Sequence, residues 1–195
     1  MKAIAKTDYD LVQEFVIGKS SSIEVLINRH KNKVYTYILL MVKNNQLAED
    51  IFQDTFIKVI RSLLEGKYKD NGRFLSWVIR IAHNLVIDHF RKEKQMNMVS
   101  NDKCEADIFN NKKFTDKNVE DDLITNQICE DLRSLIERLP EDQRQVVLLR
   151  HYGGMSFKEI ADHTQVSINT ALGRMRYALI NLRKLIKDNN VSLSV

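Results

Sequence analysis

Apolar residues recur at helical spacing along most of this chain, and this pattern constrains the fold more than any other feature. In the first half the spacing predicts four helices, over residues 8–17, 21–43, 46–64 and 74–94. A single Pro and only 6 Gly leave few of the turns that a β-sandwich needs. The sequence therefore predicts an all-α protein.

The helical pattern is interrupted after residue 95, which divides the chain into two parts. Residues 96–122 are rich in Asn, Asp and Lys, and acidic side chains outnumber basic ones among them. We therefore expect an acidic, flexible linker at 96–122 between two small helical domains at 8–95 and 123–188. In the second domain Pro140 is expected to be the first residue of a helix.

Net charge, cysteine spacing and the length of the apolar runs narrow the class of protein. The net charge of +4 is compatible with a polyanionic partner but is weak evidence alone. Cys104 and Cys129 lack zinc-ligand spacing, which favours reduced thiols in a cytoplasmic protein without a metal or cofactor. The apolar run VYTYILLMV ends at Lys43, far short of the roughly 20 residues of a membrane span, so no membrane insertion is expected.

The segment GGMSFKEIADHTQVSINTALGRMRYAL predicts a helix-turn-helix. Ser156 and Glu159 form an S-x-x-E capping box that starts a short helix at Phe157. HTQV then turns the chain, and Ser167 can cap a second helix. This second helix is expected to carry Ile168, Ala171, Leu172 and Met175 on or near its buried side. The outward side chains would be Asn169, Thr170, Gly173, Arg174, Arg176 and Tyr177.

Residues 166–187 contain no acidic side chain, although basic residues recur among them at helical spacing. A neighbouring carboxylate would oppose each phosphate contact, so an acid-free helix favours DNA binding. The first turn would then enter a major groove while later Arg and Lys residues contact phosphates. The alternative is a pair of packed helices with a solvated basic face.

Acidic side chains also gather on the helix predicted at 46–64. Its apolar stripe contains Leu47, Ile51, Thr55, Val59 and Leu63. Its opposite side carries Glu49, Asp50, Gln53 and Asp54. These acids are explained either by the helix dipole or by a docking face for a basic partner.

The helix predicted at 74–94 carries a polar stripe formed by Arg80, Asn84 and Asp88 and extended by Arg91. Its buried stripe is expected to contain Phe74, Val78, Ile81 and Leu85. The polar residues could simply stabilise the helix. Together with Trp77 and the preceding Gly-flanked loop, they are also suited to holding unstacked bases.

Four motifs together make the chain resemble an extracytoplasmic-function sigma factor of bacterial RNA polymerase. In order they are AEDIFQDTFIKV, FLSWVIRIAHNLVIDHFRK, LPEDQRQVVLLRHYGGMSFKEIA and SINTALGRMRYAL. The resemblance covers roughly residues 8–188. It implies a region 2 domain and a region 4 helix-turn-helix domain. It also implies a protein that directs core polymerase to promoters, reads the minus-thirty-five duplex and melts the minus-ten element.

The resemblance also assigns roles to particular residues. It implies that the β′ clamp helices of the polymerase are contacted by Asp50, Gln53 and Asp54. It implies that the minus-ten element is contacted by Tyr68, Asn71, Arg73, Trp77, Arg80, Asn84, Asp88 and Arg91. It implies that the minus-thirty-five duplex is contacted by Ser167, Asn169, Thr170, Arg174 and Arg176. Many members carry a basic or hydroxyl residue where this chain has Leu172 and Gly173, so base reading is expected to rest on Asn169, Thr170 and DNA shape.

The partners implied are core RNA polymerase, through its β′ clamp helices and β flap, and promoter DNA in duplex and single-stranded form. An anti-sigma factor is a further candidate partner. One alternative is a helix-turn-helix regulator that binds operator DNA without being a polymerase subunit. Another is an enzyme using Asp88 with His83 and His89, or Glu49 with Asp50. These histidines fall on different faces of one helix, the carboxylates resemble a docking patch, and no Gly-rich phosphate loop is present.

Overall fold

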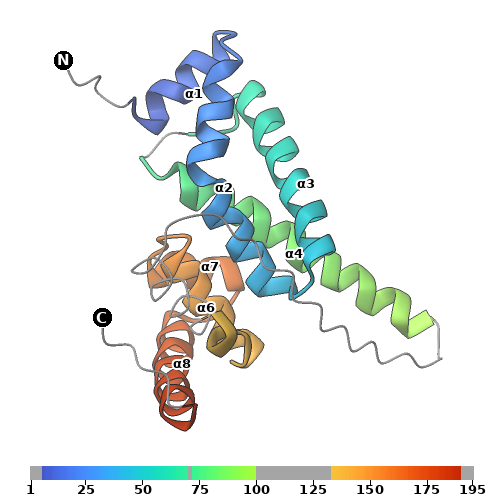
Figure 1. The fold of residues 1–195 in the computed structure, drawn as a ribbon, viewed down its shortest axis with the longest axis vertical. Coiled ribbons are helices and arrows are strands. Elements are labelled where there is room, and N and C mark those ends of the chain that lie inside the picture. The colour runs from blue at the N-terminus through green and yellow to red at the C-terminus, as the bar shows by residue number, and fades with distance from the viewer. Residues whose placement is uncertain (1–5, 70–71, 100–132, 190–195) are drawn as a thin grey trace, which may run out of the picture.

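The computed structural model describes residues 6–69, 72–99 and 133–189, and the regular elements in these ranges are helices (Figure 1). The prediction of an all-α fold is confirmed. In chain order the helices are α1 (Asp8–Val16), α2 (Ser21–Val42), α3 (Asn45–Leu64), α4 (Phe74–Val99), α6 (Glu141–His151), α7 (Phe157–Thr164) and α8 (Ile168–Asp188). A short helical stretch at 133–137 precedes α6. Most of the predicted linker lies outside the described residues.

The N-terminal half, residues 6–99, is a helical bundle organised around α2. This helix packs against α1, α3 and α4. Its buried Tyr37 and Ile38 lie in one core with Val59 of α3 and with Phe74 and Val78 of α4. Because α2 has neighbours on several sides, buried residues surround much of it, as expected for the central helix of a bundle.

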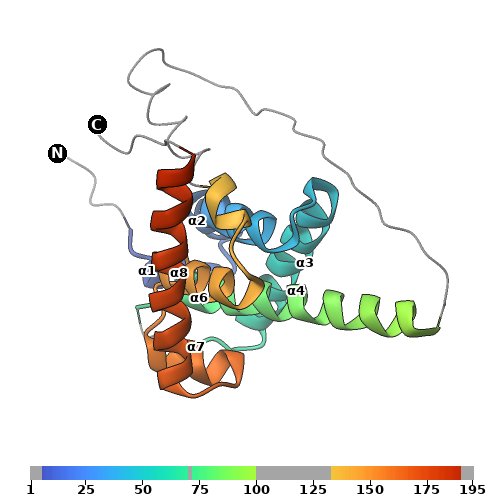
Figure 2. The ribbon, with the colours of Figure 1, turned by 90° about the horizontal axis from the view of Figure 1, so that it is seen from below.

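The C-terminal half, residues 133–189, is built on α8, which packs against both α6 and α7. Figure 2 shows α8 as the long helix running beside these shorter ones. Pro140 has an extended ψ of 144° and is the N-cap of α6, so the helix begins one residue later than predicted. Its missing N–H costs nothing there, because the first N–H groups of a helix have no partner within the helix.

The two halves share one continuous core. Val146 and Leu149 of α6 and Ile160 of α7 belong to the same buried cluster as Val34 of α2 and Ile79 of α4. The C-terminal helices lie against the bundle, whereas the far end of α4 extends beyond the other helices in both views (Figures 1 and 2). The tertiary contact between the halves therefore involves the first turns of α4 rather than its end.

The buried face of α4 is wider than predicted. Phe74 and Val78 are buried as expected, whereas Ile81 and Leu85 are only half-buried. The residues buried instead are Ile79, Ala82, His83 and Val86. The prediction assumed one packed face, but α4 packs on the bundle and on the C-terminal half, so a second stripe of side chains is removed from water.

Two residues of α8 were also placed on the wrong side. Ile168 and Leu172 were expected near the buried side, yet they are 46% and 44% exposed. The helix contacts its neighbours through Ala171 and Ala178, which are fully buried, and through half-buried Met175. Small residues allow close approach of α8 along this narrow stripe, which leaves the larger flanking side chains in solvent.

Candidate nucleic-acid interface

The helix-turn-helix forms as the sequence predicts. Ser156 Oγ accepts a hydrogen bond from the Glu159 N–H at 3.2 Å, and the Glu159 carboxylate accepts one from the Ser156 N–H at 2.8 Å. The turn that follows α7 contains Gln165 with a left-handed φ of 55°, at a position where Gly is common. The geometry of the motif is thus fixed by two caps and one left-handed residue.

The second cap defines the exposed N-terminus of α8. Ser167 Oγ accepts a hydrogen bond from the Thr170 N–H at 3.0 Å, and its hydroxyl lies 2.8 Å from that of Thr170. Asn169 is exposed beside them in the first turn, and Arg176 is exposed further along the helix. Arg174 is less accessible, because its Nη2 donates to Asp142 Oδ2 of α6 at 2.7 Å.

The acidic face of α3 points into solvent. Asp50, Gln53 and Asp54 are all exposed on one side of the helix, opposite a buried stripe. The first turn of α3 contains no acidic residue, and Asn44 caps it through a hydrogen bond from the Leu47 N–H. The helix dipole stabilises acidic side chains mainly in the first turn, so it does not account for Asp50 and Asp54. The structure therefore favours the alternative of a docking face.

Aromatic rings surround the start of α4. Tyr68, from the preceding loop, packs against Trp77 with ring centroids 4.7 Å apart and against Phe74 at 5.6 Å. Trp77 is half-buried, so part of its ring faces solvent. Asn71 lies outside the described residues. The arrangement supplies an aromatic wall next to a loop, the type of surface on which an unpaired base can stack.

Further along α4 the predicted polar stripe is present but not continuous. Asn84 is exposed, and Arg91 Nη2 donates to Asp88 Oδ1 at 3.0 Å. Arg80 forms its ion pair with the C-terminal half rather than along the stripe. The alternative that the polar residues simply stabilise the helix therefore holds for the Asp88–Arg91 pair and not for Arg80.

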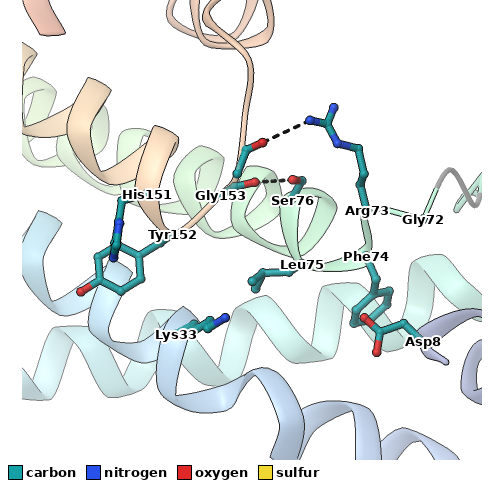
Figure 3. Close-up of a pocket in the computed structure, with 11 residues that line it drawn as sticks. Asp8, Lys33, Gly72, Arg73, Phe74, Leu75, Ser76, His151, Tyr152 and Gly153 are labelled. Atoms are coloured by element: carbon teal, nitrogen blue, oxygen red, sulfur yellow. Dashed lines mark hydrogen bonds between the residues drawn. The ribbon is translucent and has the colours of Figure 1, made fainter. Parts of the chain in front are cut away.

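The C-terminal half covers two arginines that were predicted to contact DNA. Arg73 Nη1 lies 2.8 Å from Glu159 Oε1, and Arg80 Nη2 lies 2.8 Å from the same oxygen. Arg73 Nη2 also donates to the Gly154 carbonyl at 3.1 Å, and Ser76 Oγ donates to the Gly153 carbonyl (Figure 3). A pocket of about 350 Å³ opens beside these contacts.

Burial at this contact would raise the pKa of the Glu159 carboxyl, but hydrogen bonds from Ser156 and Arg73 outweigh it and lower the pKa. The carboxylate is therefore charged where it meets the two guanidinium groups. From the sequence, Glu159 is expected only to cap its own helix. No sequence signal pairs it with Arg73, which lies 86 residues earlier.

A second polar cluster at the contact was also missed. His83 of α4 lies between Tyr37 of α2 and Gln145 of α6, at 2.7 Å and 3.0 Å. Burial lowers the pKa of His83 to about 3, and the neighbouring His163 adds to the shift. His83 is thus a buried residue at the contact between the halves rather than an exposed polar group of α4.

The described residues contain no group of three or more His, Cys, Asp or Glu side chains arranged to hold a metal ion. Within the same ranges, no helix has the length and hydropathy required to cross a membrane.

Comparison with known families assigns both halves of the chain. The family model for sigma-70 region 2 matches residues 26–96, and the model for sigma-70 region 4 matches residues 129–177. The chain belongs to the extracytoplasmic-function sigma factors. Its function as an RNA polymerase sigma factor follows, and the alternative of an independent helix-turn-helix regulator is not favoured.

Curated relatives align along nearly the whole sigma factor. It is 29% identical to the RNA polymerase sigma factor CarQ of Myxococcus xanthus, covering 91% of this chain and 96% of CarQ. It is 25% identical to the ECF RNA polymerase sigma factor SigW of Bacillus subtilis, and the alignment covers 88% of this chain and 92% of SigW.

A solved structure supports the fold of the sigma factor. The sigma factor RpoE of Bartonella quintana, crystallised with the anti-sigma factor NepR, superposes with a TM-score of 0.63. The superposition covers 85% of this chain and 96% of RpoE, at 18% sequence identity. At this identity the likeness is one of fold.

Proposed function

We propose that this sigma factor divides promoter recognition between its two halves. The loop at 68–73 and the start of α4 capture the unpaired strand of the minus-ten element. The exposed side of α8 reads the minus-thirty-five element as duplex, and the acidic face of α3 binds the β′ clamp helices of core polymerase. The domains that carry these roles are proposed at 8–95 and 123–188, with 96–122 as the linker.

One observation carries the proposal, namely the capped and acid-free N-terminus of α8. The Ser167 cap leaves Asn169 exposed in the first turn, and Arg176 follows on an exposed surface of the same helix. An amide can hydrogen-bond a base edge in the major groove, while a guanidinium can contact phosphate without reading sequence. These residues thus combine readout and positioning on one helix.

The minus-ten assignment is supported by the chemistry of α4. Tyr68 and Trp77 offer ring faces for stacking, and Asn84 offers an exposed amide for a base edge. Unpairing a base costs a few kcal/mol, which stacking and hydrogen bonds can offset. Arg73 and Arg80 add positive charge for the strand backbone.

The partners of this sigma factor are proposed to be core polymerase, including its β flap, promoter DNA and an anti-sigma factor. The last proposal draws on the RpoE structure, which holds an anti-sigma factor. The protein is proposed to act in the cytoplasm, without catalysis, a cofactor or a metal of its own.

Run-off transcription over a randomised promoter library tests the proposal. Bacterial core polymerase with the sigma factor should enrich templates that share two short elements at a fixed separation. Asn169→Ala should relax selection of the upstream element only. Transcripts no more frequent or selective than those from core polymerase alone would contradict the proposed function.

A further inference from the structure

One carboxylate in the C-terminal half binds both arginines at the start of the minus-ten surface. Glu159 Oε1 lies 2.8 Å from Arg73 Nη1 and 2.8 Å from Arg80 Nη2, and Oε2 lies 2.9 Å from Arg73 Nη1. We propose that Glu159 stands in for a DNA phosphate and holds the free sigma factor in a closed, autoinhibited form. This inference rests on the proposed role of Arg73 and Arg80 in binding promoter DNA.

The capping box orders the Glu159 side chain independently of the two arginines. Its carboxylate accepts hydrogen bonds from the Ser156 N–H and hydroxyl, at 2.8 Å and 2.9 Å, as part of the capping box of α7. The side chain is thereby ordered by its own helix, so less conformational entropy is lost when it binds Arg73 and Arg80. A carboxylate bound to guanidinium groups has the charge and acceptor geometry that a phosphate would present.

Further contacts hold the same two surfaces together. Ser76 donates to the Gly153 carbonyl, and His83 contacts Gln145. Away from α4, Lys43 Nζ donates to the Glu137 carbonyl at 2.6 Å. The C-terminal half therefore contacts the first turns of α4 at several points, and a DNA strand has to compete with Glu159 for Arg73 and Arg80.

The ion pairs of Glu159 are the part of the closure that competing charge can break, whereas the shared apolar core contributes to it independently of charge. The side chains of Arg73 and Arg80 remain 43% and 42% exposed, so water and salt screen their ion pairs. Exposed ion pairs contribute little individually, which makes the closed form sensitive to competing charge. The acidic strand of a promoter, or core polymerase binding to either half, can then open it.

Glu159→Gln separates the closure from the fold of the motif. Gln also serves at the third position of a capping box, so α7 should remain capped while the charge is lost. Asp162→Asn is the matched control, because it removes a charge from an exposed position on the same helix. Both variants are made in the full chain, and circular dichroism establishes that each is folded.

The first measurement is the distance between the halves of the free protein. Dyes are attached after Lys58→Cys and Lys184→Cys, in a chain that also carries Cys104→Ser and Cys129→Ser. Energy transfer should fall in Glu159→Gln and remain unchanged in Asp162→Asn. In the wild-type chain it should fall as NaCl is added, because salt screens the ion pairs, and this measurement does not depend on any variant at Glu159.

The second measurement is binding of a fluorescent single-stranded oligonucleotide of randomised sequence to the free chain. Glu159→Gln should bind about three- to tenfold more tightly than wild type, in keeping with loss of a partly exposed ion pair. Asp162→Asn should bind like wild type. The inference is overturned if Glu159→Gln matches Asp162→Asn in either measurement, or if wild-type energy transfer does not respond to salt.

A pull-down with core polymerase distinguishes this inference from the proposed function. If wild-type protein fails to associate with core polymerase, the proposed function is wrong, whatever the energy transfer shows. If it associates while Glu159→Gln leaves both measurements unchanged, only the closure is wrong.

Discussion

The imidazole rings of His83 and His163 pack against each other across the contact between the two halves, with their centroids 4.7 Å apart. Gln145 Nε2 can only donate, so His83 Nε2 accepts its hydrogen bond. The Nδ1–H of His83 therefore donates to Tyr37 Oη, at 2.7 Å. The hydrogen bond from Gln145 requires an unprotonated Nε2, so this arrangement requires the neutral ring.

Acid should destabilise this sigma factor through His83. Burial lowers its folded-state pKa to about 3, and the pKa of His163 is also lowered, by burial and by nearby Arg80. Below the unfolded pKa of about 6.5 the unfolded chain binds more protons, so the free energy of unfolding falls as pH falls. For His83 alone we expect a loss of about 1.4 kcal/mol between about pH 7.5 and about pH 5.5.

Urea denaturation at several pH values measures this loss. His83→Gln serves as the comparison, because its side chain does not titrate in this range. The variant should be less stable than wild type near neutral pH and should show a shallower decline toward acid. A decline as steep as that of wild type would assign the effect to other groups.

Two glycines should respond oppositely to alanine. A Cβ at Gly153 would lie 2.6 Å from the Leu149 carbonyl oxygen and 3.3 Å from Ile79 Cγ2. Gly153→Ala must therefore shift backbone at the contact between the halves, and we expect it to reduce the free energy of unfolding by about 1–3 kcal/mol.

Gly173 supplies the matched comparison within α8. A Cβ there would meet nothing within 4 Å, so Gly173→Ala should raise the free energy of unfolding by about 0.5–1 kcal/mol through helix propensity. Chemical denaturation of both variants provides the test. Equal effects of the two substitutions would mean that the close approach at Gly153 does not constrain the fold.

Asp54→Arg should weaken association with core polymerase by roughly tenfold, because a cation would replace an exposed anion facing a basic partner. A titration of labelled sigma factor with core polymerase measures the affinity. Glu24→Arg makes the same charge reversal at an exposed position of α2 outside the acidic face of α3. Affinity unchanged in Asp54→Arg, or reduced equally in both variants, would exclude the docking role.

Asn84→Ala should impair strand opening more than duplex binding. The exposed Asn84 side chain can change without loss of packing, whereas Trp77→Ala would also remove contacts with Tyr68 and Phe74. Permanganate footprinting on promoter complexes with core polymerase reports opening, and a mobility shift reports binding. Normal permanganate reactivity in Asn84→Ala would count against a melting role for this residue.

Much of the local structure could be predicted, because its causes are local. The capping box of Ser156 and Glu159 and the Ser167 cap depend on residues three positions apart, and both form as expected. The same holds for α3, whose stripe from Ile51 to Leu63 is buried opposite its acidic side. Hydrophobic periodicity did not predict the buried residues of a helix that packs on two sides. Ile79 of α4 is fully buried although it lies outside the predicted stripe.

The sequence by itself determined that the chain is helical, that it carries a helix-turn-helix with an acid-free second helix, and which motifs it shares with sigma factors. Only the tertiary structure decided that the two halves meet, that Glu159 binds Arg73 and Arg80, and that His83 is buried against Tyr37 and Gln145. The physical reason is the separation along the chain between the residues that interact. Caps and helix faces follow from neighbours along the chain, whereas these ion pairs and buried hydrogen bonds join residues that only the packing of distant helices brings together.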